Sequence, residues 1–374
     1  MTNNEGAKTF ISKGNVVALF AFDIGLEVSL EQLGALLESA QIQPLSPKKQ
    51  TPPYVQYSKP PRIVNLPHDA GTKPHLPGLP ETRCQVQATV FDFGAVSIAY
   101  RWPLTSESKL ALEDLPRLSQ QLYRQGLESR ARDHARWLMA RMLAAISRPE
   151  LSRLVEDYYL FIIEELDSTL SADQLMSQHR QTLAQVLRFE TERLSQEQQS
   201  EALKQRISYY ESDLVVVDWN AAIIYDRDYW DAANVLELLN VELLEARYVD
   251  GQLDLRIGEY QKIVPRPIGW FVPFRNPYRK AIQELAELRI ESVLLSERVE
   301  NVLKLIGDLY LARVHAAATE RFYLPTWQAA ISGKLEIVGD FYQLLTDRVR
   351  TAQSQTLELV IILLILAEIL MAIL

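Results

Sequence analysis

The stretch Thr356–Leu374, T-L-E-L-V-I-I-L-L-I-L-A-E-I-L-M-A-I-L, decides between a soluble and a membrane-anchored class of fold. Thirteen of the eighteen residues from Leu357 to Leu374 are Leu, Ile or Val. As an α-helix this segment would extend about 27 Å, at roughly 1.5 Å per residue, which just crosses a hydrocarbon core of about 30 Å. The length therefore permits one membrane span.

Two acids interrupt this apolar segment, Glu358 and Glu368. Each large aliphatic residue favours insertion by up to about 0.6 kcal/mol, whereas one central acid costs about 2.5–3.5 kcal/mol. The sum predicts a C-terminal membrane anchor; the alternative is a terminal helix buried in a protein core or an oligomer. Because a carboxyl group in lipid would be protonated or shared with another chain, Glu368 also predicts a homo-oligomer or a protein partner.

Two apolar seams before the tail step alternately by four and three residues, which is the spacing of a coiled coil. The first seam contains Ala281, Leu285, Leu288, Ser292, Leu295, Val299, Val302, Ile306, Leu309 and Arg313, and the second contains Leu335, Val338, Tyr342, Leu345, Val349, Ala352, Thr356 and Leu359. Pro325 and the Ser332-Gly333 pair lie between them. We predict an antiparallel coiled-coil hairpin whose second arm continues into the anchor.

The composition is that of a globular protein, with 374 residues, 48% hydrophobic and 23% charged. The net charge of −9 argues against general binding to nucleic acid. A single cysteine, Cys84, excludes an intrachain disulfide and a cysteine-based zinc cluster. The first fifteen residues carry no apolar stretch of signal-peptide length, so we expect the body to stay in the cytoplasm.

Three β-rich runs predict one mixed sheet: Val16–Phe22, Gln85–Trp102 and Leu214–Ile224. A helix should follow Ser29, which has Gln32 at the capping-box spacing. Residues 116–208 carry helical spacing, including a stripe of Leu154, Tyr158, Phe161 and Glu165. The fold class is therefore α+β: a small mixed β-sheet with a large helical part, the coiled-coil hairpin and a C-terminal transmembrane helix.

Residues 41–80 hold ten of the eighteen prolines and predict a loop or linker. The basic residues in this segment are Lys48, Lys49, Lys59, Arg62 and Lys73, against the single acid Asp69. They are candidate contacts for a phosphate or a protein partner, and a solvated insertion is the simpler alternative.

Two aspartates follow strands, Asp92 and Asp218, and they form the candidate enzymatic site, a metal-dependent or hydrolase-like one. Asp92 lies in Asp92-Phe93-Gly94, which resembles Asp23-Ile24-Gly25, and this spacing is also typical of turns. The usual nucleotide, metalloprotease and serine-hydrolase motifs are absent from the sequence. We therefore predict a protein that is not an enzyme and has no cofactor or metal.

Several segments resemble the required-for-meiotic-nuclear-division family, a domain family of unknown function. The matching segments are V-F-D-F-G-A-V at 90–96, D-L-V-V-V-D-W-N-A-A-I-I at 213–224, L-E-L-L-N-V-E-L-L-E-A-R-Y-V-D at 236–250 and L-E-L-V-I-I-L-L-I-L-A-E-I-L at 357–370. The signature residues in them are Phe91, Asp92, Gly94, Asp218, Trp219, Asn220, Asn240, Glu245, Glu358 and Glu368. The resemblance implies a membrane-anchored protein without catalytic residues, in a family with one mitochondrial member linked to organellar translation.

Together these observations predict three parts: an α/β body at 1–264 that includes the insertion 41–80, the helical hairpin at 265–355, and the anchor at 356–374. The expected function is a single-pass, membrane-anchored scaffold or adaptor with its body in the cytoplasm and an unknown protein partner. The alternative is an enzyme that uses Asp92 with Asp218.

Overall fold

A computed structural model describes residues 8–37, 40–42, 60–67, 70–77, 79, 84–263, 279, 282–284, 286 and 309–373. The chain divides into two compact units: the first contains Met1–Glu245 and Val299–Pro325, and the second contains Ala246–Arg298 and Thr326–Leu374. The division falls within two long helices, α7 (Trp230–Ile263) and α10 (Leu324–Ile373). The three domain limits predicted from the sequence stay a prediction.

The first unit is built on a nine-stranded sheet with the order β3-β4-β5-β6-β1-β8-β11-β10-β9. Its strands are β1 (Ile11–Asp23), β3 (Ala40–Ile42), β4 (Arg62–Asn65), β5 (Gln85–Val90), β6 (Ala95–Thr105), β8 (Glu156–Leu166), β9 (Gln205–Ile207), β10 (Leu214–Val217) and β11 (Ala221–Tyr225). All neighbours are antiparallel except β8 and β11. The three predicted β-rich runs thus lie in one mixed sheet, which is confirmed, and the sheet is larger than predicted.

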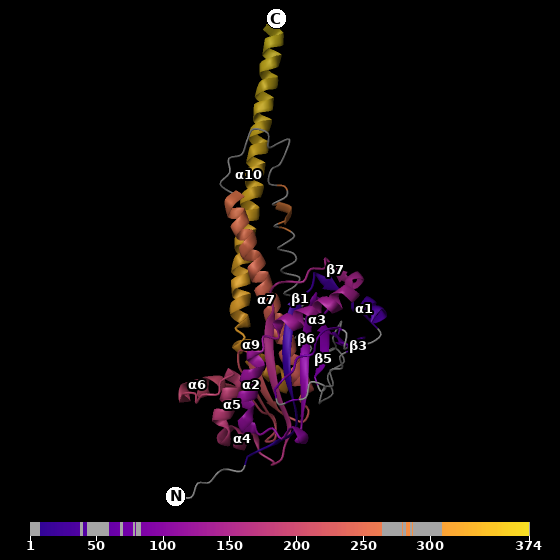
Figure 1. The fold of residues 1–374 in the computed structure, drawn as a ribbon. Coiled ribbons are helices and arrows are strands. Elements are labelled where there is room, and N and C mark those ends of the chain that lie inside the picture. The colour runs from indigo at the N-terminus through magenta and orange to yellow at the C-terminus, as the bar shows by residue number, and fades with distance from the viewer. Residues whose placement is uncertain are drawn as a thin grey trace. The chain divides into compact units, whose positions relative to one another are not determined.

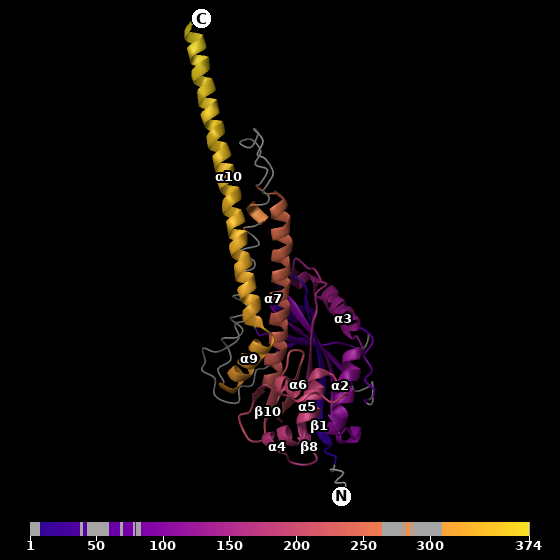
Figure 2. The same cartoon turned by 90° about the vertical axis from the view of Figure 1, so that its left-hand side faces the viewer.

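Each face of this sheet carries its own hydrophobic core, because successive side chains of a strand point to opposite faces. From β1, Val16, Ala18, Phe20 and Phe22 enter one core, and Val17 and Leu19 enter the other. The first core is closed by α2 (Leu115–Arg124), α3 (Glu128–Arg141) and α5 (Arg180–Arg188), and the second by the first half of α7 and by α9 (Leu309–Arg321). Figure 2 shows these two helical layers on either side of the strands.

The remaining elements are short. They are the helices α1 (Leu30–Leu36), α4 (Ala172–Gln178) and α6 (Gln196–Ala202) and a separate strand pair, β2 (Glu27–Val28) with β7 (Ile146–Ser147). The predicted helix after Ser29 is confirmed as α1, and the Ser29 hydroxyl accepts a hydrogen bond from the Gln32 amide at 3.4 Å. Figure 1 shows the order of the elements along the chain.

One helix predicted in 116–208 is wrong. The stripe of Leu154, Tyr158, Phe161 and Glu165 lies on β8 and the loop before it, and β8 is a central strand between β1 and β11. Its sequence, E-D-Y-Y-L-F-I-I-E-E-L, is buried on both faces, so the polar–apolar alternation that marks a strand is missing. A continuous apolar run then matches helical spacing as well as strand spacing.

The prediction that 41–80 is only a loop or linker is also wrong. Ala40–Ile42 forms the edge strand β3, and Arg62–Asn65 forms β4, which lies between β3 and β5. Leu66, Ala70 and Leu76 are buried in the core on the α2 and α3 face of the sheet. Proline is tolerated at a sheet edge because a missing backbone donor there breaks few ladder hydrogen bonds.

In the second unit, α10 packs against the end of α7. Val249 and Leu253 of α7 form a buried cluster with Ile331, Val338, Leu345 and Val349 of α10. The Lys334 ammonium lies 2.7 Å from carboxylate oxygens of both Asp250 and Asp254. Helix α7 continues without a break through Gly251 to Ile263.

The second predicted seam therefore packs, in the described residues, partly against α7. Most of the first predicted seam, residues 285–308, lies outside the residues that the structure describes. Ile282 is among the described residues, and it packs against the same cluster. The coiled-coil hairpin stays a prediction.

Two glycine turns interlock at one end of the sheet, at Asp23-Ile24-Gly25 and Asp92-Phe93-Gly94. The Ile24 amide donates to the Gly94 carbonyl at 2.8 Å. Gly94 has φ of +94°, and a Cβ built there would overlap the Gly25 carbonyl oxygen. The sequence similarity of the two turns thus reflects a close backbone contact that excludes any side chain.

We predict that Gly94→Ala destabilises the protein by about 3 kcal/mol or more, because the methyl group meets both an unfavourable φ and the Gly25 carbonyl. Gly126→Ala is the matched control, since Gly126 also has a positive φ of +59° but no atom within 4 Å of its Cβ position. The control should lose only about 1–2 kcal/mol. Urea unfolding in detergent measures the free energy of unfolding of both variants. Equal losses of stability in the two variants would contradict the overlap at Gly94.

Candidate functional site

The two aspartates predicted for catalysis lie at the same end of the sheet but far apart along it. Asp92 is in the turn between β5 and β6, and Asp218 is in the turn between β10 and β11. Strands β6, β1, β8 and β11 separate the two turns. At about 4.8 Å per strand, the separation is roughly 19 Å, too far for one metal ion or a shared proton. Among the described residues, no group of three or more His, Cys, Asp or Glu side chains could hold a metal.

Asp218 is instead the centre of a buried ion network. Its carboxylate lies 2.7 Å from Nε of Arg321 and 2.9 Å from Nε of Arg188, and it accepts the Trp219 amide at 2.8 Å. The Tyr158 hydroxyl donates to the Asp218 carbonyl at 3.0 Å. Arg321 is the last residue of α9, so the network attaches that helix to the β10–β11 hairpin. This geometry is that of a structural clamp.

The signature residue Glu245 lies near a second buried acid, Asp23, at the end of β1. Glu245 on α7 is 2% exposed, and neither of its carboxyl oxygens has a hydrogen-bond partner. Burial and the nearby Asp23 charge raise its pKa well above the usual range. Burial also raises the pKa of Asp23 to about 7, against a hydrogen bond from the Gly25 backbone. At neutral pH this pair therefore holds at least one proton.

The other predicted residues are spread over the chain. Phe91 is buried beside Phe93, Asn220 is buried, and the Asn240 amide donates to the Glu156 carbonyl at 3.2 Å. Trp219 is exposed. Arg62 begins β4 and Lys73 lies in 70–77, whereas Lys48, Lys49 and Lys59 lie outside the described residues. Glu358 and Glu368 lie on the exposed C-terminal part of α10. The predicted homo-oligomer and protein partner stay predictions.

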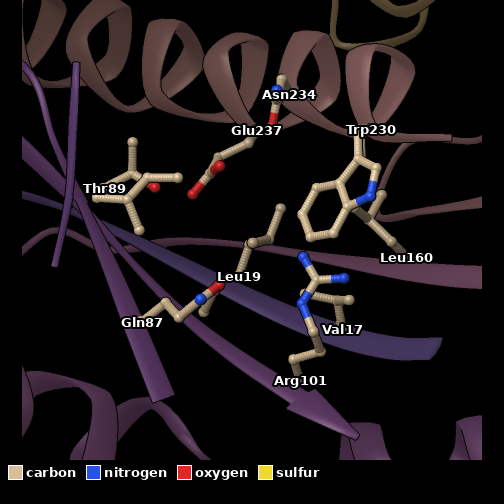
Figure 3. A pocket seen from close by; sticks show the side chains of 12 residues that line it. Val17, Leu19, Gln87, Thr89, Arg101, Leu160, Trp230, Asn234 and Glu237 are labelled. Atoms are coloured by element: carbon tan, nitrogen blue, oxygen red, sulfur yellow. The ribbon is translucent and has the colours of Figure 1, made fainter. Parts of the chain in front are cut away.

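A polar cavity lies between the first turns of α7 and the sheet, and we call it the Arg101 cavity. Its volume is about 30 Å³. Its polar lining consists of Gln87, Thr89, Arg101, Asn234 and Glu237, with the Trp230 ring, and its apolar lining consists of Val17, Leu19, Ile63, Ala99, Leu160 and Ala233. Figure 3 shows the guanidinium group of Arg101 beside the Trp230 ring, and the Glu237 carboxyl group turned toward Thr89.

Arg101 enters the cavity from β6, on the face of the sheet that α7 covers. The centre of its guanidinium group lies 4.5 Å from the centroid of the Trp230 ring, and Nη1 donates to the Tyr229 hydroxyl at 3.3 Å. Its Nε is buried without a hydrogen-bond partner. Burial lowers the pKa of Arg101, and Tyr229 and Glu237 oppose this effect. A guanidinium group stays charged regardless, so the cavity contains a poorly solvated positive charge.

The two acids near Arg101, Glu164 and Glu237, interact with other side chains. Asn15 links Glu164 to Tyr229, because its amide group donates to the Glu164 carboxylate at 3.0 Å and to the Tyr229 hydroxyl at 3.2 Å. The Lys13 ammonium lies 2.6 Å from Glu164. For Glu237, burial raises the pKa, opposed by the nearby hydroxyls of Ser97 and Thr89 and by the Arg101 charge. Among the described residues, no carboxylate forms an ion pair with Arg101.

Sequence reasoning missed this cavity. The available signal was Arg101 itself, which stands between Tyr100 and Trp102 in a strand run that is otherwise buried. A charge at that position of an alternating strand faces the same layer as Ala99, and it needs a polar partner there. The partners Trp230 and Glu237 come from a helix more than 120 residues later, so no local pattern could connect them.

The fold and the cavity define an α+β protein with a mixed nine-stranded sheet and one helix long and apolar enough to cross a membrane. A family model described as "Uncharacterized protein MJ0711, N-terminal domain" matches residues 13–231. The chain belongs to this family. The uncharacterized protein MJ0711 of Methanocaldococcus jannaschii is 27% identical over 232 residues, which cover 62% of this chain and 70% of that protein. No solved structure matches the chain.

We predict that the Asp23 carboxyl group makes the protein less stable as the pH rises from about 4 to about 7. Asp23 keeps its proton up to about pH 7 in the folded state but loses it near pH 3.8 when unfolded. The folded state thus binds more protons in this window, and the free energy of unfolding falls by at most about 4 kcal/mol. Above about pH 7 this contribution is constant.

The measurement is urea unfolding between pH 4 and 8 of the wild type and of Asp23→Asn, whose amide oxygen still accepts the Gly25 hydrogen bond. The difference between the two pH profiles isolates Asp23 from the other buried acids. Asp133→Asn, at an exposed pair with Arg136, is the control. If the Asp23→Asn profile keeps the wild-type slope, Asp23 does not carry the proton.

We predict that Arg321→Met costs about 3 kcal/mol or more, because it leaves the buried Asp218 carboxylate with Arg188 alone. Arg136→Met, which breaks the exposed pair with Asp133, should cost less than about 1 kcal/mol. Chemical unfolding of both variants tests this difference. A loss for Arg321→Met as small as that of the control would show that the clamp contributes little to stability.

Proposed function

We propose that this protein is a non-enzymatic, membrane-anchored scaffold or adaptor, with its α+β body held at the cytoplasmic face by the C-terminal part of α10. The resemblance seen in the sequence supports this proposal, since it too implies an anchored protein without catalytic residues. The roughly 19 Å between the turns that hold Asp92 and Asp218 favours this function over the alternative hydrolase-like enzyme.

The observation that carries the proposal is the exposure of an apolar helical segment. The most apolar eighteen-residue window of α10 has a mean hydropathy of 2.2, and 0% of it is buried. Leu357, Ile362 and Leu364 are each more than 60% exposed. A soluble monomer rarely exposes so large a contiguous apolar surface, and a bilayer of about 30 Å would cover it.

The charges beside this segment support the orientation. Arg348 and Arg350 lie on the same helix, about two turns before the apolar segment begins at Leu357. Basic residues that flank a membrane span tend to stay on the cytoplasmic side. The two arginines therefore favour a cytoplasmic location for the amino-terminal side of the span and for the folded body.

The continuity of α10 gives the anchor a mechanical role. The helix runs without a break from Leu324 to Ile373, so the packed part of the second unit and the apolar segment belong to one helix. Lys334 and the Ile331–Val349 cluster fix this helix to α7. A continuous helix between the packed part of the second unit and the apolar segment is stiffer than a flexible linker.

We predict that the full chain fractionates with membranes and resists extraction by alkaline carbonate, whereas a chain ending at Thr356 is released as a folded body. Leu364→Arg should weaken insertion, because a central arginine costs about 2.5–3.5 kcal/mol. Leu344→Arg is the matched control, since Leu344 is also an exposed leucine of α10 but precedes the apolar segment. Carbonate extraction followed by immunoblotting reads out all four proteins.

Full-length protein that stays monodisperse in detergent-free buffer would contradict the anchor. Equal extraction of Leu364→Arg and Leu344→Arg would contradict the assignment of the span to residues 357–374.

A further inference from the structure

We propose that the Arg101 cavity binds the carboxylate group of a small organic acid. This site is distinct from the membrane anchor and does not depend on it.

Within the described part of the chain, Arg101 has acidic neighbours, Glu237 and Glu164, but forms no ion pair with them. No carboxylate among the described residues forms an ion pair with its guanidinium group, and Nε is buried without an acceptor. Glu164 is engaged by Lys13 and Asn15. A mostly buried positive charge without a partner is costly, so the cavity favours an anionic ligand that supplies the missing acceptor.

The geometry leaves part of the guanidinium edge available. The Trp230 ring covers one face, 4.5 Å from the centre of the guanidinium group, and the Tyr229 hydroxyl occupies Nη1 at 3.3 Å. These two contacts restrict the orientation of the group and leave Nε without a hydrogen-bond acceptor among the described residues. The planar guanidinium fork matches a carboxylate, which accepts two parallel hydrogen bonds.

The remaining polar lining suits an anion as well. The Asn234 and Gln87 amides can each donate a hydrogen bond. Glu237 would repel an anion if ionised, but its carboxyl group is buried, and a protonated carboxyl group donates a hydrogen bond instead. The charged groups nearest to it are Arg101 on β6 and, behind Asn15 and Tyr229, Glu164 and Lys13.

The size selects a carboxylate. A volume of about 30 Å³ accommodates about two water-sized atoms, since one needs roughly 10–15 Å³ on this measure. Two atoms correspond to the two oxygens of a carboxylate, whereas phosphate and sulfate carry four oxygens in a tetrahedron. The two oxygens already fill a space of this volume, so the cavity takes the carboxylate group alone, and the rest of the acid extends out of it.

The test is a titration of the full-length protein in detergent with sodium acetate, at constant ionic strength set by chloride. Binding is followed by the fluorescence of Trp230, and Trp230→Phe identifies the part of the signal that comes from this ring. Acetamide is the neutral probe of the same shape, and sulfate is the larger anion. We expect saturable binding of acetate that is at least tenfold tighter than binding of acetamide or sulfate.

Arg101→Gln should weaken acetate binding about tenfold or more, as expected for loss of a charge-assisted hydrogen bond. Arg141→Gln is the matched control, because Arg141 also lies over an indole ring, that of Trp137 at 3.6 Å, but outside the cavity. Glu237→Gln keeps a neutral donor of the same shape and should bind acetate at least as tightly as the wild type. Thermal unfolding of each variant confirms that it is folded.

Three results would overturn the proposal. The first is a wild-type protein with no saturable response to acetate, which needs no variant to interpret. The second is equal affinity for acetate in Arg101→Gln and Arg141→Gln. The third is a loss of tenfold or more in Glu237→Gln, which would show that the cavity needs an ionised glutamate and therefore does not take an anion.

Discussion

The burial of β1 on both faces is the constraint on which the rest of the first unit depends. Its thirteen residues pair with β6 on one side and with β8 on the other, and its alternate side chains enter two separate cores. Each large apolar side chain that is fully buried contributes about 1.5–3 kcal/mol. A strand used in this way needs helices on both faces of its sheet, and α7 and α9 must therefore return to a sheet formed mainly by earlier residues.

The charged groups inside the unit follow from this arrangement. Where α9 ends over the β10–β11 hairpin, Arg321 meets Asp218, and the pair is buried because the helix covers it. Where α7 crosses the strands, Arg101 faces Trp230 at one place, and Asp23 lies near Glu245 at another. The charge of Asp218 is neutralised by Arg321, and the charge repulsion between Asp23 and Glu245 is relieved by a bound proton. Among the described residues, Arg101 has neither an ion-pair partner nor a way to lose its charge, and this distinguishes its cavity.

The second unit combines a small packed core with a long exposed apolar surface. Its two helices have a small shared core and a bridging lysine, and one of them continues into a segment whose apolar side chains are exposed. Such a surface is stable in a bilayer and unstable in water. Two features bear on function: a C-terminal helix long and apolar enough to cross a membrane, and a polar cavity in the body.

The sequence by itself determined the apolar C-terminal helix, the three β-rich runs and the two Asp-x-Gly turns, because each of these is encoded by adjacent residues. It could not identify β8, whose burial on both faces removes alternation, or the short strands β3 and β4 in and beside the proline-rich segment. It also could not place Asp218 with Arg321, or Arg101 with Trp230 and Glu237. These groups meet only because the chain returns across the sheet after more than 100 residues, so tertiary structure alone decided them.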